Sequence, residues 1–128
     1  MSAKNNESEI QAKLRALLPD RPTGGIGEAL GGWRDRIDLL DRLLLTLLNE
    51  RATCANEIGQ MKKRLGLPVY VPSREEEVIA NVRGSNEGPL PDAAVQHLFE
   101  RIIDEIRSLE RRSMQDEPGT PDERSEDK

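Results

Sequence analysis

Aromatic side chains are nearly absent from this sequence, which has one Trp, one Tyr and one Phe among its 128 residues. Charged residues make up 34% of the chain. This composition favours a helical bundle over a sheet protein. A chain this short, with its apolar residues strung along helices, has difficulty closing a core alone, and oligomerisation is the usual remedy.

Cysteine and histidine occur once each. A single cysteine excludes an intramolecular disulfide and a cysteine-based zinc site. Cys54 falls among apolar positions, so we expect it to be a small buried residue. His97 neighbours the apolar stripe of the expected last helix and has no second histidine to pair with, so we interpret it as structural or exposed.

Long apolar runs are absent as well. The longest candidate, residues 43–45, is interrupted by Thr46 and then by charge, and the N-terminus has no apolar leader core. The net charge of −5 disfavours non-specific binding to nucleic acid or anionic membranes. We therefore expect a cytoplasmic protein that binds neither, in which an anionic ligand requires a local cluster of cations.

The most informative pattern that is present is a heptad repeat, spaced three-four-three-four, which we call the seam. Its positions are Leu30, Trp33, Ile37, Leu40, Leu44, Leu47, Arg51, Cys54, Ile58, Met61 and Leu65. Such a repeat predicts one long helix packed against a partner along its length. Arg51 interrupts it, and a guanidinium there is costly to bury without an anion. Either a carboxylate of the chain, with Glu110 the main candidate, or a ligand supplies that anion.

The apolar repeat, together with the glycine, proline and capping residues that mark helix ends, predicts an all-α fold of three helices. The first helix is expected to be very long, and the chains to form an intertwined homodimeric bundle. The first helix begins between Gly27 and Trp33 and ends at Leu65, before Gly66. The second runs from about residue 74 to 83, with Ser73 beginning a capping box, and the third from about 91 to 114. We divide the chain into a partly flexible extension (1–26) with a helix of two to three turns ending before Pro19, a domain (27–114) and a disordered charged tail (115–128).

Three cations on the first helix point to a site shared between two chains. Arg51 and Lys62 are eleven residues apart, which is about 16 Å on nearly the same side of a helix. Arg34 lies about 25 Å from Arg51 along the axis, too far to share a small ligand within one chain. In an antiparallel pair, however, Arg34 of the second copy falls opposite residues near 60, and symmetry produces two such sites.

Other charged residues near this site are Arg74 and Glu75, at the start of the second helix, and Glu110, which continues an apolar stripe of the third. Each of them alone is more simply explained as a solvated or salt-bridged residue. The remaining basic residues of these regions are assigned to solvent; they are Lys63, Arg64, Arg83, Arg107, Arg111 and Arg112.

Taken together, these residues resemble the all-helical (AroQ-type) chorismate mutase family over roughly residues 30–112. The matching segments are WRDRIDLLD (33–41), LLNER (47–51), EIGQMK (57–62), PVYVPSRE (68–75) and LFERII (98–103), with Glu110 eleven residues after Phe99. Each segment alone is a weak signal, whereas their combined order and spacing are specific. The resemblance implies an intertwined homodimer that converts chorismate to prephenate, on the route to phenylalanine and tyrosine, with no metal and no cofactor.

The resemblance also implies a role for each site residue. Arg51 and the partner's Arg34 would hold the two carboxylates of chorismate. Lys62 would contact a carboxylate and the ether oxygen, and Glu110 would donate a hydrogen bond to that oxygen. Glu75 and the backbone N–H of Val71 would hold the ring hydroxyl, and Arg74 would line the pocket and order Glu75. The catalytic residues would thus be Lys62, Glu110 and Arg51.

Two departures from the family pattern and two rival functions remain open. Val71 stands where many members have an acid, which would weaken hydroxyl recognition, and Ile106 stands where a small or polar residue is common, which would make the pocket tighter and drier. One rival is an isochorismate-pyruvate lyase on the same scaffold, which Glu75 disfavours. The other is a non-catalytic helical dimer that regulates a shikimate-pathway enzyme, which leaves Arg51 unexplained.

Overall fold

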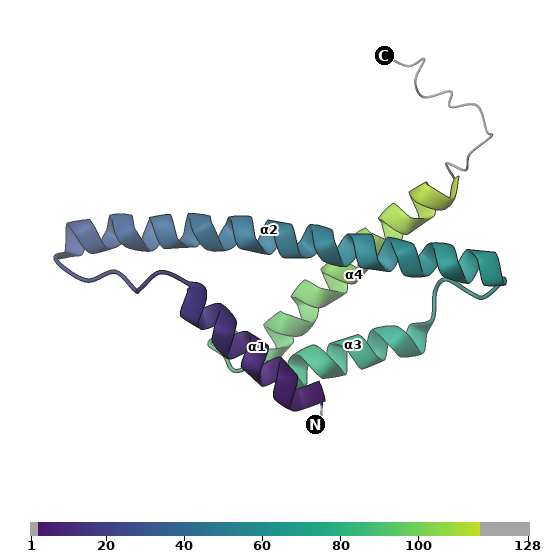
Figure 1. Ribbon diagram of the computed structural model, residues 1–128, viewed down its shortest axis with the longest axis horizontal. Helices are drawn as coiled ribbons and strands as arrows, with labels where there is room; N and C mark the ends of the chain where they lie inside the picture. The colour runs from purple at the N-terminus through teal and green to yellow at the C-terminus, as the bar shows by residue number, and fades with distance from the viewer. Residues whose placement is uncertain (1–2, 116–128) are drawn as a thin grey trace, which may run out of the picture. The chain divides into compact units, whose positions relative to one another are not determined.

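The computed structural model describes residues 3–115, and their side chains for residues 9–112. This part of the chain is all helical: α1 is Ala3–Leu17, α2 is Ile26–Leu65, α3 is Pro72–Ser85 and α4 is Asp92–Gln115 (Figure 1). The predicted all-α class is confirmed, with α2 as the very long first helix of the expected three, whereas the intertwined homodimeric bundle stays a prediction. The predicted tail, residues 115–128, lies almost wholly outside the described residues.

The chain divides into two compact units, Met1–Thr46 and Leu47–Lys128, and α2 contributes its first part to one and its second part to the other. In the first unit, α1 is longer than predicted, 15 residues instead of two to three turns. The connection after it is fixed to α2 at two points. The Arg36 guanidinium donates a hydrogen bond to the carbonyl of Pro19, and a Cβ at Gly32 would lie 2.9 Å from Pro22 Cβ. Gly32 therefore permits a close approach of the connection.

The second unit contains the end of α2, α3 and α4. Gly66, with a φ of +72°, ends α2 in a left-handed conformation that glycine adopts without strain. The N–H of Gly66 donates to the Lys63 carbonyl at 3.1 Å and that of Leu67 to the Lys62 carbonyl at 2.8 Å. These two bonds make a Schellman motif, as the Gly66 terminator predicted.

The start of α3 differs from the prediction. The helix begins at Pro72 with Val71 as N-cap, not at Arg74 with Ser73 as cap, and the Val71 side chain, being apolar, makes no capping hydrogen bond. The reason is steric. Proline suits the first helical position, and it holds the preceding residue extended, as the Val71 φ of −129° and ψ of 104° show.

Packing within the second unit joins α3 to α4, and α4 crosses the second part of α2 (Figure 1). Asn86 organises the turn between α3 and α4, because its amide donates to the Leu90 carbonyl at 2.7 Å and to Asp92 at 2.8 Å. Arg83 links the same helices by donating to Gln96 at 2.9 Å. Of the described apolar side chains, Val95 and Ile106 form the buried core.

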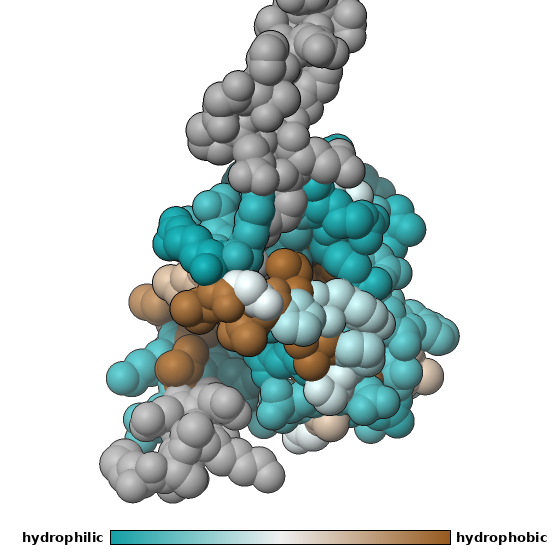
Figure 2. All heavy atoms as spheres, turned by 90° about the vertical axis from the view of Figure 1, so that its right-hand side faces the viewer, coloured by the Kyte–Doolittle hydropathy of each residue, from teal (hydrophilic) through white to brown (hydrophobic). Residues whose placement is uncertain are grey.

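Much apolar surface stays uncovered in the single chain. Eight seam residues are at least 41% exposed; they are Leu30, Trp33, Ile37, Leu44, Leu47, Ile58, Met61 and Leu65. Figure 2 faces the end where α2 passes into the loop toward α3, and brown apolar side chains gather there among hydrophilic ones. Leu65, Leu67 and Tyr70, each at least 50% exposed, lie in this region. None of the described helices is long and apolar enough to cross a membrane.

Candidate active site

One pocket of about 400 Å³ lies within the second unit, between the end of α2, the loop before α3, and the facing sides of α3 and α4. Six of the seven residues predicted for the site line it: Arg51, Lys62, Val71, Arg74, Glu75 and Glu110. The apolar part of its wall includes Ile58, Val69, Val78, Ile103 and Ile106. Residues up to 59 positions apart, which were predicted from the sequence to share one site, thus line one cavity in the fold.

Arg34, the seventh predicted residue, lies in the first unit, is exposed, and is not among the lining residues. The sequence placed it in the site through a second chain, so its role stays a prediction.

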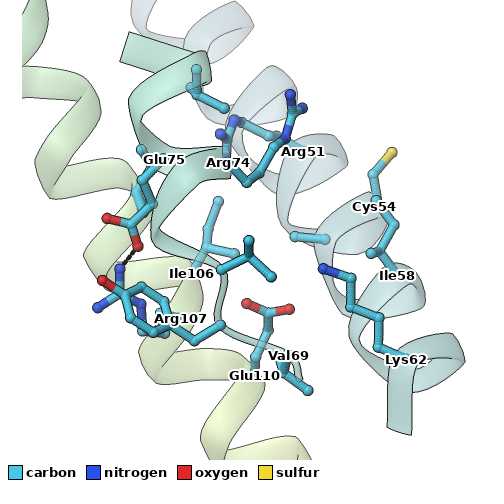
Figure 3. A pocket seen from close by; sticks show the side chains of 15 residues that line it. Arg51, Cys54, Ile58, Lys62, Val69, Arg74, Glu75, Ile106, Arg107 and Glu110 are labelled. Atoms are coloured by element: carbon cyan, nitrogen blue, oxygen red, sulfur yellow. Dashed lines mark ion pairs between the residues drawn. The ribbon is translucent and has the colours of Figure 1, made fainter. Parts of the chain in front are cut away.

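The cationic wall of the pocket comes from α2. Arg51 and Lys62 extend from this helix into the cavity, toward α3 and α4 (Figure 3). Within the described part of the chain, neither side chain forms an ion pair, so the expected alternative of an Arg51–Glu110 salt bridge is not present. Burial, and then the positive charge of Arg74, lowers the pKa of Arg51. The negative charge of a bound anion would oppose both effects and raise the pKa of Arg51 again.

Glu110 faces this wall from α4, and its carboxylate points toward the Lys62 amine (Figure 3). Burial raises the pKa of Glu110 above its usual value, and the positive charges of Lys62, Arg107 and Arg51 oppose that rise. The net shift favours the protonated carboxyl, which is a hydrogen-bond donor, over the carboxylate, which only accepts. Lys62 donates hydrogen bonds in its charged form and Glu110 only when protonated, so an oxygen placed between them would have two donors only below the pKa of Glu110.

Arg74 and Glu75 lie next to each other in the first turn of α3 but have different partners. Arg74 pairs with Glu77 at 2.5 Å on an exposed side of the helix. Glu75 forms an ion pair with Arg107 of α4 (Figure 3). The implied ordering of Glu75 by Arg74 is therefore absent from the structure, and an arginine from another helix takes that place.

One assignment made from the sequence was wrong. Arg107 is a pocket-lining residue with only 27% of its side chain exposed, not a solvated one. Its position four residues after Ile103, and hence on the same side of α4, was the signal that could have revealed it. Cys54 lines the pocket and is exposed in the single chain, like other seam residues, so its predicted burial in the seam stays a prediction.

The described residues contain no group of three or more His, Cys, Asp or Glu side chains able to hold a metal ion. The pocket instead combines four cationic side chains with two acids on an apolar wall, in a chain whose net charge is −5. Such a local excess of positive charge suits a small anionic molecule.

Comparison with known proteins agrees with this geometry. Residues 33–111 match the sequence profile of chorismate mutase type II. The chain belongs to the type II chorismate mutase family. All of the pocket-lining residues fall inside the matched range.

Related proteins carry the same name. The chain is 42% identical over 86 residues to a bifunctional chorismate mutase/prephenate dehydratase of Neisseria gonorrhoeae, covering 67% of this chain and 23% of that protein. It is 38% identical over 89 residues to the bifunctional enzyme of Aquifex aeolicus, covering 66% and 25%. The chain thus spans about a quarter of the length of these relatives.

A solved structure of a chorismate mutase from Thermus thermophilus has a TM-score of 0.65 to this chain at 40% sequence identity, with 66% of this chain and 97% of that chain covered. About two thirds of this chain therefore share the helical fold of that chorismate mutase.

Proposed function

We propose that this chain catalyses the rearrangement of chorismate to prephenate. The observation that carries the proposal is the pocket itself, in which Arg51 and Lys62 have no carboxylate partner among the described residues and face Glu75 and Glu110 across an apolar wall. Chorismate is a dianion with a ring hydroxyl and an ether oxygen, and each of these groups has a counterpart among the pocket residues.

Catalysis of this reaction requires that the substrate be held in the reactive conformer and that the charge developing in the transition state be stabilised. The reaction is unimolecular: the C–O bond of the enolpyruvyl ether breaks as a C–C bond to the ring forms. Arg51 binds one carboxylate and helps to hold the compact conformer in which the reacting carbons meet. Negative charge builds on the ether oxygen as its bond breaks, and Lys62 and protonated Glu110 donate to it. Donors that act more strongly on the transition state than on the ground state raise the rate.

The remaining roles concern the ring hydroxyl and the second carboxylate. Glu75 accepts a hydrogen bond from the hydroxyl, the Val71 backbone N–H contacts the same group, and Arg74 lines the pocket. Arg34 of a second copy of the chain holds the second carboxylate. Ile106 is 8% exposed and lines the cavity, which supports the expected dry pocket wall.

The exposed seam supports a homodimer. At least eight apolar seam residues would be covered if α2 packed against a second α2, and uncovered apolar surface on this scale is typical of an interaction surface. We therefore propose that the active unit is a symmetric pair in which each pocket receives Arg34 from the partner chain.

The direct test incubates the purified protein with chorismate and, separately, with isochorismate, and identifies the products. We expect prephenate from chorismate and no pyruvate from isochorismate. Pyruvate from isochorismate without prephenate from chorismate would instead establish the lyase. If neither substrate is consumed, the reading as a non-catalytic helical dimer replaces the enzyme.

A further inference from the structure

Arg107 is held from two sides at the edge of the pocket. Its guanidinium forms an ion pair with Glu75, and its central carbon lies 4.1 Å from the centroid of the Tyr70 ring. The two ion-paired side chains are 27% and 30% exposed, so the pair is partly withdrawn from water. Three elements meet here: Tyr70 is in the loop after α2, Glu75 is on α3 and Arg107 is on α4.

The two contacts use different parts of the guanidinium. The central carbon lies over the Tyr70 ring in a cation–π contact, while an N–H group of the same guanidinium pairs with the Glu75 carboxylate. The ring therefore restrains the position of the guanidinium that donates to Glu75. Glu75 is bound through Oε2, and the acceptor capacity of Oε1 remains available to another donor. The arrangement holds a carboxylate in place without using both of its oxygens.

The exposed ion pairs of the chain provide a contrast. Arg101 and Glu105, also on α4, pair at 2.7 Å with side chains that are 76% and 58% exposed, and such pairs contribute little. Arg74, adjacent to Glu75, is engaged with Glu77. Among the pairs Arg74–Glu77, Arg101–Glu105 and Arg107–Glu75, the last joins two helices and lies on the pocket wall.

We propose that Arg107 and Tyr70 are positioning residues of the chorismate pocket: the ring holds the guanidinium, and the guanidinium holds Glu75 with one oxygen free for the substrate's ring hydroxyl. This proposal rests on the proposed function. It assigns the recognition of the hydroxyl to three interacting side chains, Tyr70, Arg107 and Glu75, instead of Glu75 alone.

A second consequence concerns the proton on Glu110. The groups facing this carboxyl are Lys62 and Arg51 from α2, Arg107 from its own helix, and Arg74 and Glu75 from α3, which line the same pocket. The charge of Arg107 holds the pKa of Glu110 lower than burial alone would. Without that charge the pKa rises further, so Glu110 stays protonated, and the alkaline decline of activity moves to higher pH.

The test compares Arg107→Met with Arg107→Lys. Methionine keeps the apolar stem but removes charge and donors, whereas lysine keeps the charge without the planar edge. Arg101→Met removes an arginine from an ion pair on the same helix outside the pocket and is the matched control. Substrates are chorismate and an analogue in which hydrogen replaces the ring hydroxyl.

We expect Arg107→Met to lower kcat/KM for chorismate about tenfold but to change that for the analogue less than twofold, a coupling typical of groups that act together. The decline of kcat/KM at alkaline pH moves to higher pH in Arg107→Met, while in Arg107→Lys it stays where it is in the wild type. Arg101→Met matches the wild type in every measurement. Equal losses on both substrates, or no loss on chorismate, would overturn the positioning role.

If the circular dichroism melt shows that Arg107→Met does not fold, two variants of Tyr70 provide the test instead. Tyr70→Phe keeps the aromatic face and should retain wild-type selectivity for the hydroxyl, while Tyr70→Leu should lose part of it. Equal behaviour of these two variants would overturn the role of the ring. Absence of chorismate turnover by the wild type would overturn the proposed function itself, a result separate from any difference among variants.

Discussion

Arg51 is a cation that the fold partly buries without an ion-pair partner among the described residues, although the nearby Glu110 carboxyl partly offsets the effect of this burial on its pKa. The pKa of Arg51 is lowered by burial and by Arg74, so the free protein holds this charge at a cost. Residues that lower stability and yet face a cavity are expected at functional sites. We therefore interpret Arg51 as serving the ligand and not the packing of the helix.

Replacing Arg51 with alanine separates these two roles. We expect turnover of chorismate to fall by about a thousandfold, because a charge aimed at the substrate is lost. The free energy of unfolding should change by no more than about 0.5 kcal/mol, since no ion pair of the described structure is broken. Steady-state kinetics and urea unfolding measure the two effects. A strong loss of stability with turnover retained would show that the arginine is structural.

Glu110 gives the activity a pH dependence whose direction follows from its surroundings. Burial is the largest influence on its pKa and raises it. The protonated form donates to the ether oxygen and the ionised form does not, so kcat/KM should be highest below this pKa and decline as the pH rises through it. Glu110→Gln donates at every pH and should flatten the profile. A profile in this variant that still declines as in the wild type would rule out Glu110 as the donor.

At the scale of elements, the sequence predicted the helices well and their ends less well. The repeat of the seam and the Gly66 terminator located α2, because apolar spacing and glycine act locally. The N-cap of α3 was misplaced because the steric effect of Pro72 outweighed the hydrogen-bonding pattern of Ser73 and Glu76. The partners of Glu75 could not be predicted either, because they depend on how α4 packs against α3 and the preceding loop.

The Schellman motif after α2 also concerns the site, since the Leu67 N–H is bound to the carbonyl of Lys62 itself. Gly66→Ala places a Cβ at a φ of +72° with no neighbour within 4 Å, so its cost is conformational. We expect a loss of about 1 kcal/mol in the free energy of unfolding. Gly84→Ala, within α3 and equally open, should instead be neutral or stabilising. Urea unfolding of both variants at the same chain concentration measures the two changes in the free energy of unfolding. Equal changes would contradict the stabilising role of the Schellman motif.

At the scale of the whole molecule, the exposed seam and the missing second carboxylate ligand have one common explanation. The single chain buries few apolar side chains, and its pocket does not include Arg34, the residue assigned from the sequence to the second carboxylate of the dianion. A second chain packed on α2 would cover the seam and bring Arg34. The sequence indicated this partner through spacing alone, and the pocket within one chain is consistent with it.

Association can be measured before any kinetics. Leu47, a seam residue, is 56% exposed in the chain. We expect sedimentation to give twice the 14.4 kDa chain mass for the wild type. Leu47→Glu, which would place a charge in the apolar contact, should sediment as a monomer and lose activity. Glu57→Gln alters an exposed residue of the same helix outside the seam and should remain dimeric. A monomeric wild type with full activity would contradict the proposed assembly.

The central claim is that each pocket combines Arg51 of one chain with Arg34 of another. Its most direct test mixes two inactive variants, Arg34→Ala and Arg51→Ala, after unfolding and refolding them together. In a mixed dimer one pocket has both arginines and the other has neither, so about a quarter of the wild-type chorismate mutase activity should return at equal amounts, given random pairing of the two chains. Each variant refolded alone should stay inactive. A mixture that also stays inactive, with mixed dimers shown to form, would contradict the shared pocket.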